Sequence, residues 1–194
     1  MTSLLVGDDG RPRCAWAGSD AEYQRYHDEE WGTPLHGDGP LFEKLSLEGF
    51  QAGLSWITIL RRRPTFRLAF HNFDIDAVAA FDARDVERLM ADPGIIRNRL
   101  KVDATISNAR VTRELIDGHP GALDQLIWSF APPRRDHAPA SFADLPAVTP
   151  ESTALSKALK KLGYRFVGPT TIYAMMQSGG MVDDHIAGCW RSSY

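Results

Sequence analysis

The chain has 194 residues, of which 43% are hydrophobic, and its formal net charge at pH 7 is −3. This length can build one sizeable core or two small lobes that share a groove. No apolar stretch approaches the roughly 20 residues that a transmembrane helix needs, so we expect no membrane association. Residues 1–13 lack a basic start followed by an apolar run, so we expect no signal peptide and a protein of the cytoplasm.

Charged residues are segregated along the chain. Residues 20–30 are acid-rich, whereas basic residues gather at 61–67, 97–101 and 157–165. A single basic cluster is most often a solvated helix face. Three of them in a chain that is acidic overall also favour a local phosphate-binding surface.

The spacing of apolar residues predicts helices in the first half of the chain. A first helix follows Asp20, a residue type that suits the capping position. A second begins at Pro40 and carries an apolar stripe to Leu54. Shorter helices are then expected over 55–60, 64–70, 76–81 and 85–90.

The helical pattern continues in the second half. We expect a long helix over 99–116 that Gly118 ends. The segment 131–150 is rich in proline, alanine and charge, which predicts a long loop and the only candidate linker inside the chain. No stretch alternates as a strand and no internal repeat is present, so we predict an all-α fold. Further helices are expected over 121–130, 149–162 and 168–177.

Both cysteines lie near the ends of the chain, each with a histidine at a spacing that metal ligands use. The pairs are Cys14 with His27 and His185 with Cys189. Thiolate and neutral imidazole are the ligands that zinc prefers, and two of each complete a structural site. The residues alone leave two alternatives open, because the cysteines can also be small buried hydrophobes or form a disulfide. A shared zinc ion would join the two ends, which argues against two independent domains.

The segment 92–99 lies between two predicted helices and contains a Pro-Gly pair, which predicts a tight turn. Amides after Gly94 can point outward as the next helix begins and bind a phosphate oxygen. Arg97, Arg99 and Lys101 add positive charge nearby. An ordinary interhelical turn explains the segment equally well, because the usual second glycine of a helix-hairpin-helix is missing.

Glu48 is a carboxylate inside the apolar stripe of the second predicted helix. Burying the Glu48 charge without partners would be costly, and the stability of a fold rarely requires a buried charge. A surface position and a structural ion pair are the alternatives to a functional role. The aromatic residues of this part of the chain are core residues by default. They are Trp16, Tyr23, Tyr26, Trp31 and Trp56.

Several segments form a combination that is far more specific than any one of them. They are RCAW at 13–16, YHDEEWG at 26–32, LEGFQAGLSWI at 47–57, GIIR at 94–97, LSKALKK at 155–161, FVG at 166–168, and Asp184-His185 with Cys189. In this order they resemble the 3-methyladenine DNA glycosylase I family of bacteria. Only the first dozen residues and the last few fall outside the resemblance.

The resemblance implies a helix-hairpin-helix DNA glycosylase fold, with the hairpin at about 92–99 and two lobes around a base pocket. We expect a single helical domain over 13–194 and a flexible N-terminal extension over 1–12. One structural zinc ion is expected to join the N- and C-terminal segments, because four protein ligands leave no open position for water. The zinc ligands implied by the family are Cys14, His27, His185 and Cys189.

The implied activity is base-excision repair, by hydrolysis of the N-glycosidic bond of 3-methyladenine in double-stranded DNA. A base must be flipped out of a duplex before an enzyme reaches this bond, so a lined pocket and a wedge are needed. Leu54 corresponds to the wedge. The DNA-binding surface would also include Gly94, Arg97, Arg99 and Lys101. The base pocket would be lined by Trp16, Tyr26, Glu48 and Trp56.

Glu48 is the expected catalytic carboxylate. Most helix-hairpin-helix glycosylases carry an aspartate shortly after the hairpin, but the stretch here offers only Asp103, inside the long predicted helix. Glu48 would stabilise the positive charge that develops on the sugar, or position water. Because no lysine stands out as a Schiff-base former, we predict a monofunctional enzyme that leaves an abasic site.

Two other functions stay open. A non-catalytic, zinc-stabilised helical module could bind damaged or single-stranded DNA through its basic clusters and aromatic residues. A carboxylate in the aromatic pocket argues against this, because it repels phosphate. Alternatively, the same enzyme could act on 3-methylguanine or another alkylated purine. For the glycosylase we expect a monomer of the bacterial cytoplasm.

Overall fold

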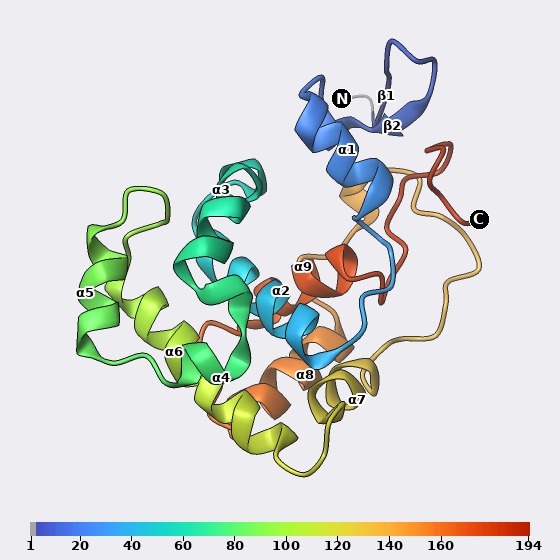
Figure 1. The fold of residues 1–194 in the computed structure, drawn as a ribbon. Helices are drawn as coiled ribbons and strands as arrows, with labels where there is room; N and C mark the ends of the chain where they lie inside the picture. The colour runs from blue at the N-terminus through green and yellow to red at the C-terminus, as the bar shows by residue number, and fades with distance from the viewer. Residues whose placement is uncertain (1–2) are drawn as a thin grey trace.

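The computed structural model describes residues 3–194, which fold mostly into helices around a central helix (Figure 1). A short hairpin of two strands precedes the helices. The elements are β1 (Leu4–Val6), β2 (Pro12–Cys14), η1 (Ala15–Ala17), α1 (Ala21–Glu29), α2 (Asp38–Gln51), α3 (Trp56–Ala69), η2 (His71–Phe73), α4 (Ile75–Ala79), α5 (Ala83–Ala91), α6 (Arg99–Ile116), α7 (Ala122–Trp128), η3 (Phe142–Asp144), α8 (Pro150–Lys161) and α9 (Pro169–Ser178).

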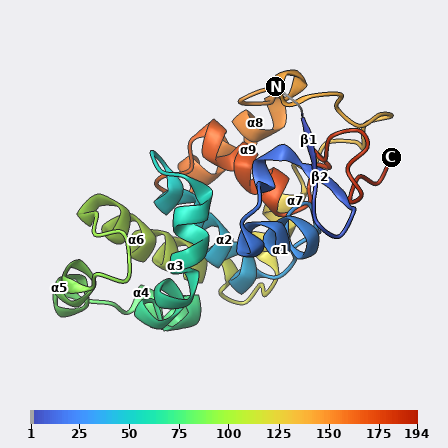
Figure 2. The same cartoon turned by 90° about the horizontal axis from the view of Figure 1, so that it is seen from above.

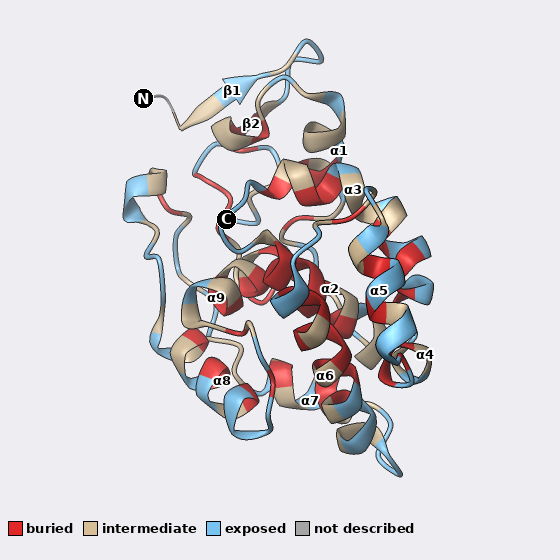
Figure 3. Cartoon of the chain, turned by 90° about the vertical axis from the view of Figure 1, so that its left-hand side faces the viewer, coloured by how far each residue is buried: buried red, intermediate tan, exposed pale blue. Residues whose placement is uncertain are grey.

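Helix α2 is the centre of the fold. It contacts α3, α6, α7, α9 and η2, and every residue from Leu41 to Phe50 is buried except Glu43 (Figure 3). A helix that is buried nearly all round has no solvent face, so its polar side chains must find partners inside the protein. Glu48 and Lys44 are therefore core residues by position.

Local signals predicted the starts of α1 and α6 correctly. Asp20 caps α1 by accepting a hydrogen bond from the Tyr23 amide at 3.0 Å. Asn98 caps α6 through the Lys101 amide at 3.2 Å, and the helix spans 99–116 as expected. These signals depend on residues within one turn, which is why the sequence alone reveals them.

Two predictions about elements are wrong. The helices expected over 55–60 and 64–70 are one helix, α3, with Pro64 inside it. Proline removes one backbone hydrogen bond from a helix, but Ile59, Leu60 and Phe66 are buried on both sides of it, so packing holds the helix continuous. The all-α prediction also omitted the hairpin, whose three-residue strands are too short to show alternation.

The N-terminal hairpin and the C-terminal segment lie on the same side of the molecule (Figures 1 and 2). Strands β1 and β2 are antiparallel, with Leu4 opposite Cys14. The Trp190 amide donates to the Pro12 carbonyl at 2.9 Å, which places the end of the chain against β2. The segment 1–12, expected to be a flexible extension, thus contributes a paired strand; residues 1–2 lie outside the described part.

None of the helices in residues 3–194 is both long enough and apolar enough to cross a membrane.

Candidate functional site and metal centre

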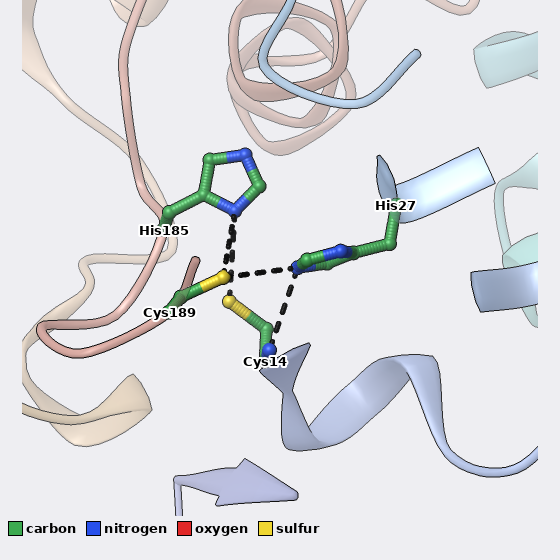
Figure 4. A group of neighbouring side chains, drawn as sticks. All are labelled: Cys14, His27, His185 and Cys189. Atoms are coloured by element: carbon green, nitrogen blue, oxygen red, sulfur yellow. Dashed lines mark hydrogen bonds between the residues drawn. The ribbon is translucent and has the colours of Figure 1, made fainter. Parts of the chain in front are cut away.

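Four potential metal ligands from distant parts of the chain meet in one buried cluster (Figure 4). Cys14 ends β2, His27 lies on α1, and His185 and Cys189 belong to the C-terminal segment. Their ligand atoms all lie within 4.8 Å of one another, and both cysteines are free thiols rather than a disulfide. The Cys189 Sγ lies 3.4 Å from His27 Nε2 and 3.5 Å from His185 Nδ1.

The cluster fits a tetrahedral zinc ion. Zn–S bonds of about 2.3 Å and Zn–N bonds of about 2.0–2.1 Å place neighbouring ligand atoms roughly 3.3–3.8 Å apart. Three separations lie in this range: the two from Cys189 Sγ given above and 3.8 Å from Cys14 Sγ to His185 Nδ1. The Cys14 thiol and the two imidazoles lower the pKa of the Cys189 thiol well below its usual range, which favours the thiolate.

The surroundings of the cluster orient both imidazoles. His27 turns Nδ1 to the Asp28 carboxylate at 2.8 Å, and His185 turns Nε2 to the Trp31 carbonyl at 3.3 Å. Arg13 holds Asp28 through two nitrogens, at 2.9 and 2.7 Å. Histidines that bind a metal commonly donate their second N–H to a carboxylate or a carbonyl in this way. The arrangement leaves Nε2 of His27 and Nδ1 of His185 for a metal ion.

A cavity of about 210 Å³ lies beside this cluster of potential metal ligands, called the metal cluster below. Its wall shares side chains with the surroundings of the cluster, because the Trp16 ring lies 5.3 Å from His27 and the Trp31 ring 4.6 Å from His185, between centroids. Residues from η1, α1, α2, α3, η3 and α9 contribute to the wall. The aromatic residues among them are Trp16, Tyr23, Tyr26, Trp31, Trp56 and Phe142.

Glu48 is the acidic residue of this cavity. Its side chain is only 3% exposed, and Ser178 Oγ donates a hydrogen bond of 2.8 Å to Oε1. Burial raises the pKa of Glu48, whereas the positive charge of Lys44 and the hydrogen bond from Ser178 act in the opposite direction. The cavity therefore combines π faces with a carboxylate, an arrangement that attracts a flat cation.

Lys44 is a second buried charge, one helical turn before Glu48 on α2. Its Nζ lies 5.2 Å from the centroid of the Trp56 ring and 5.5 Å from that of Tyr26. Burial lowers the pKa of Lys44, and the nearby Glu48 charge opposes this shift. The Lys44 ammonium group thus lies over the Tyr26 and Trp56 rings, close to the Glu48 carboxylate.

The turn between α2 and α3 borders the cavity. It joins Gln51 to Trp56, both of which line the cavity, and Leu54 is 41% exposed within it. Lys101 Nζ holds this turn by donating to the carbonyls of Phe50 at 2.7 Å and Ala52 at 2.6 Å. The prediction that Lys101 contacts DNA is therefore wrong, since its side chain is buried and occupied at the end of α2.

The turn between α5 and α6 packs on α3. Thr65 Oγ1 donates to the Gly94 carbonyl at 2.6 Å, and a side chain at Gly94 would lie 3.0 Å from the Thr65 Cβ. The Gly94 amide donates to the Asp92 carboxylate at 2.7 Å. Arg97 and Arg99 are exposed at the end of this turn and at the start of α6.

The basic cluster at 61–67 is largely neutralised by ion pairs. Arg61 pairs with Asp20, and Arg63 NH2 donates to the Glu30 carboxylate at 2.8 Å. The acid-rich segment 20–30 and this basic segment therefore face each other across α1 and α3. Segregated charges in the sequence here mark a contact between elements rather than a free phosphate-binding surface.

Comparison with known proteins identifies the family. A sequence model of the methyladenine glycosylase family matches residues 16–192. DNA-3-methyladenine glycosylase 1 of Escherichia coli K12 is 46% identical over 182 residues, which are 91% of this chain and 95% of the relative. The DNA-3-methyladenine glycosylase of Haemophilus influenzae is 44% identical over 182 residues, 91% of this chain and 96% of the relative. The chain belongs to the methyladenine glycosylase family.

Solved structures of family members have the same fold. A crystal structure of 3-methyladenine DNA glycosylase I matches with a TM-score of 0.89 at 46% identity, covering 93% of this chain and 99% of that one. The enzyme from Staphylococcus aureus, from work on 3-methyladenine recognition, matches with a TM-score of 0.87 at 33% identity, covering 94% of this chain and 97% of that one. The family predicted from the sequence is thus confirmed.

Most residues that the family resemblance selected come together in the structure. Trp16, Tyr26, Glu48 and Trp56 all line the cavity, and the four predicted metal ligands meet beside it. Asp103 instead pairs with Arg99 on α6, at 3.4 Å. Sequence analysis missed other members of the site. They are Lys44 beneath the aromatic wall, Phe142 and Leu145 from the segment expected to be a linker, and Gln51, Gln177 and Ser178 on the cavity wall.

Lys44 and Gln51 carried a signal in the sequence, because they lie four positions before and three positions after Glu48 on one helix. Lys44 lies one turn from Glu48, so a helix that buries one of them tends to bury the other. Phe142, Leu145 and Gln177 reach the cavity from segments nearly a hundred positions or more away, a proximity that spacing along the chain does not reveal.

Proposed function

We propose that this family member is a monofunctional DNA-3-methyladenine glycosylase, which hydrolyses the N-glycosidic bond of the alkylated base in double-stranded DNA and leaves an abasic site. The observation that carries the proposal is the buried Glu48 carboxylate in an aromatic cavity. Methylation at N3 makes adenine cationic, and a carboxylate with π faces suits such a base. The names of the Escherichia coli and Haemophilus influenzae relatives support the same activity.

The proposed mechanism requires little acid catalysis from the protein. A flipped base enters the cavity, where Trp16 and Trp56 contact its faces and Glu48 accepts a hydrogen bond from the exocyclic amine, with Tyr26 beside it. The cationic base is already a good leaving group, so strong protonation is unnecessary. Glu48 then stabilises the positive charge that develops on the sugar or positions water, without forming a covalent bond.

Two turns supply the proposed DNA surface. Leu54 is exposed beside the cavity and would fill the gap that the flipped nucleotide leaves. The α5–α6 turn would act as the DNA-binding hairpin, with amides after Gly94 and the side chains of Arg97 and Arg99 near the phosphates. Lys101 is excluded from this surface because it is buried.

We further propose that Cys14, His27, His185 and Cys189 hold one structural zinc ion. Four protein ligands leave no position for a substrate or a nucleophilic water, so the ion would stabilise the fold rather than take part in the reaction. We also expect the enzyme to act as a monomer in the bacterial cytoplasm.

The test uses DNA treated with a methylating agent, incubated with the purified protein, and chromatography of the released bases. Release of 3-methyladenine is the expected result, with strand breaks appearing only after heat or an added lyase. Nicking without either would contradict the monofunctional mechanism. A protein that binds this DNA but releases no base would instead be the non-catalytic binding module.

A further inference from the structure

Asp184 is a buried carboxylate between the metal cluster and the cavity, and the function proposed above does not use it. It is fully buried, and its Oδ2 accepts hydrogen bonds from Tyr173 Oη at 2.7 Å and Gln177 Nε2 at 2.8 Å. Its Oδ1 lies 2.6 Å from Arg135 NH1. Oδ2 therefore serves as the acceptor for both donors, while the Arg135 guanidinium lies against the other oxygen.

The consequence of this network is a fixed orientation for the Gln177 amide. A carboxylate accepts hydrogen bonds and donates none, so the amide nitrogen of Gln177 must face Asp184. The carbonyl oxygen Oε1 lies on the other side of the same planar group. Because Gln177 lines the cavity together with Glu48 and Ser178, this oxygen is the atom of the amide left for a ligand. A glutamine without such a partner could present either atom.

Glu48 and Gln177 Oε1 are thus two acceptors on the cavity wall, and as a pair they match one kind of purine. Adenine carries an amino group, a donor, at the ring position where guanine carries an oxygen, an acceptor. An amine can donate to Glu48 and to Gln177 Oε1. The guanine oxygen would face acceptors and stay unpaired, and sites that leave buried polar groups unpaired discriminate strongly between ligands.

We propose that Gln177 determines specificity for 6-amino over 6-oxo purines and that Asp184 is its positioning residue. This inference rests on the proposed function and deepens it, since it selects 3-methyladenine over 3-methylguanine as the lesion released. Arg135 and Tyr173 support this arrangement because their contacts fix the position of the Asp184 carboxylate.

Asp184→Asn is the most informative variant. The introduced amide can donate to Gln177, whose own amide then turns and places its nitrogen toward the cavity. A donor there suits the guanine oxygen, so the ratio of 3-methyladenine to 3-methylguanine released should fall by at least about threefold. Gln177→Met removes the acceptor and leaves Asp184, Arg135 and Tyr173 in place, so it should lower the same ratio. Asp183→Asn is the matched control, because Asp183 accepts from His185 N and Ser193 and does not contact Gln177.

The experiment measures both bases by chromatography from one preparation of methylated DNA, for the wild type and the three variants. A merely structural role for Asp184 would lower the release of both bases together and leave their ratio unchanged. An unchanged ratio in Gln177→Met, with an active wild type, overturns the inference, and it decides the question even if Asp184→Asn does not fold. A wild type that releases neither base overturns the proposed function itself.

Discussion

Glu48 illustrates how burial changes the chemistry of a common side chain. Taking a carboxylate out of water disfavours its charged form, and Lys44 and Ser178 offset only part of that cost. Because the pKa of Glu48 is higher in the folded state, ionisation of this side chain opposes folding. The stability that the protonated side chain contributes is complete below the unfolded-state pKa, and it is lost as the pH rises through the folded-state pKa. Such a cost is typical of a functional site rather than of a structural one.

We predict that Glu48→Gln lowers the rate of base excision by about a hundredfold, since one electrostatic stabiliser of the reaction is lost. The amide oxygen can still accept the Ser178 hydrogen bond, so the variant should remain folded. Single-turnover excision and thermal unfolding measure the two effects. Glu43→Gln on the same helix is the control, because Glu43 pairs with Arg67 outside the cavity. An unchanged excision rate would remove Glu48 from the mechanism.

Lys44 should set the pH range of the reaction. Its positive charge lowers the pKa of Glu48, so Lys44→Met should raise that pKa further. Activity that requires the carboxylate is lost as the pH falls through this pKa, so the acidic limb of the pH–rate profile should move to higher pH in the variant. Lys157→Met, at an exposed position on α8, should leave the profile in place. The same shift in both variants would contradict a specific role for Lys44.

At the scale of elements, two turns between helices form the proposed DNA surface. Both are held by contacts with other elements: the Leu54 turn through Lys101 on α6, and the Gly94 turn through Thr65 on α3. Fixed turns can present an exposed side chain at a defined position without the entropy cost of ordering a loop on binding.

Arg97→Ala should weaken DNA binding and lower the slope of log affinity against log salt concentration by about 0.9, the value expected for one lost phosphate contact. Fluorescence anisotropy over a series of salt concentrations measures this slope. Arg67→Ala serves as the comparison, because the Arg67 guanidinium is already paired with Glu43 at 2.8 Å. Equal slopes for Arg97→Ala and the wild type would remove Arg97 from the phosphate contacts.

Leu54→Ala should reduce excision from duplex DNA more than excision from single-stranded DNA, because only a duplex leaves a stacked gap for a wedge to fill. The ratio of the two rates, compared between variant and wild type, is the measurement. Leu68→Ala, on the exposed side of α3, is the control for losing a surface leucine. A ratio that matches the wild type would exclude the wedge role.

At the scale of the whole molecule, the metal cluster joins the two ends of the chain to one wall of the cavity. Cys14 lies two positions before Trp16, and His27 directly follows Tyr26, so two cavity residues are next to ligands. Loss of the proposed zinc ion should therefore loosen base recognition together with the fold.

We predict that wild-type protein contains one zinc ion per chain and that Cys14→Ser and Cys189→Ser lose it. Each substitution should lower the melting temperature by at least about 5 °C, because structural zinc contributes directly to folding free energy. Metal analysis and thermal unfolding provide the measurements. A chelator should lower the melting temperature of the wild type and leave that of the variants unchanged. Variants that keep their zinc would contradict the assigned ligands.

The sequence by itself determined the features that depend on neighbouring residues. The starts of α1 and α8 follow from Asp20 and Thr149, and the extent of α6 from its apolar spacing, because capping and periodicity act within a few residues. The family, the four cysteine and histidine residues of the cluster and the cavity residues Trp16, Tyr26, Glu48 and Trp56 followed from the family resemblance of segments that the sequence displays in order.

Only the tertiary structure decided which charged side chains are exposed and which are buried or paired with other residues. Lys101 and Arg97 belong to one basic run, yet the first is buried against α2 and the second is exposed. The Arg61–Arg67 cluster is paired with acids far away in the chain, and Gln177 is oriented by Asp184. The energy of a charge depends on which atoms surround it, and in a folded chain most of those atoms come from distant segments.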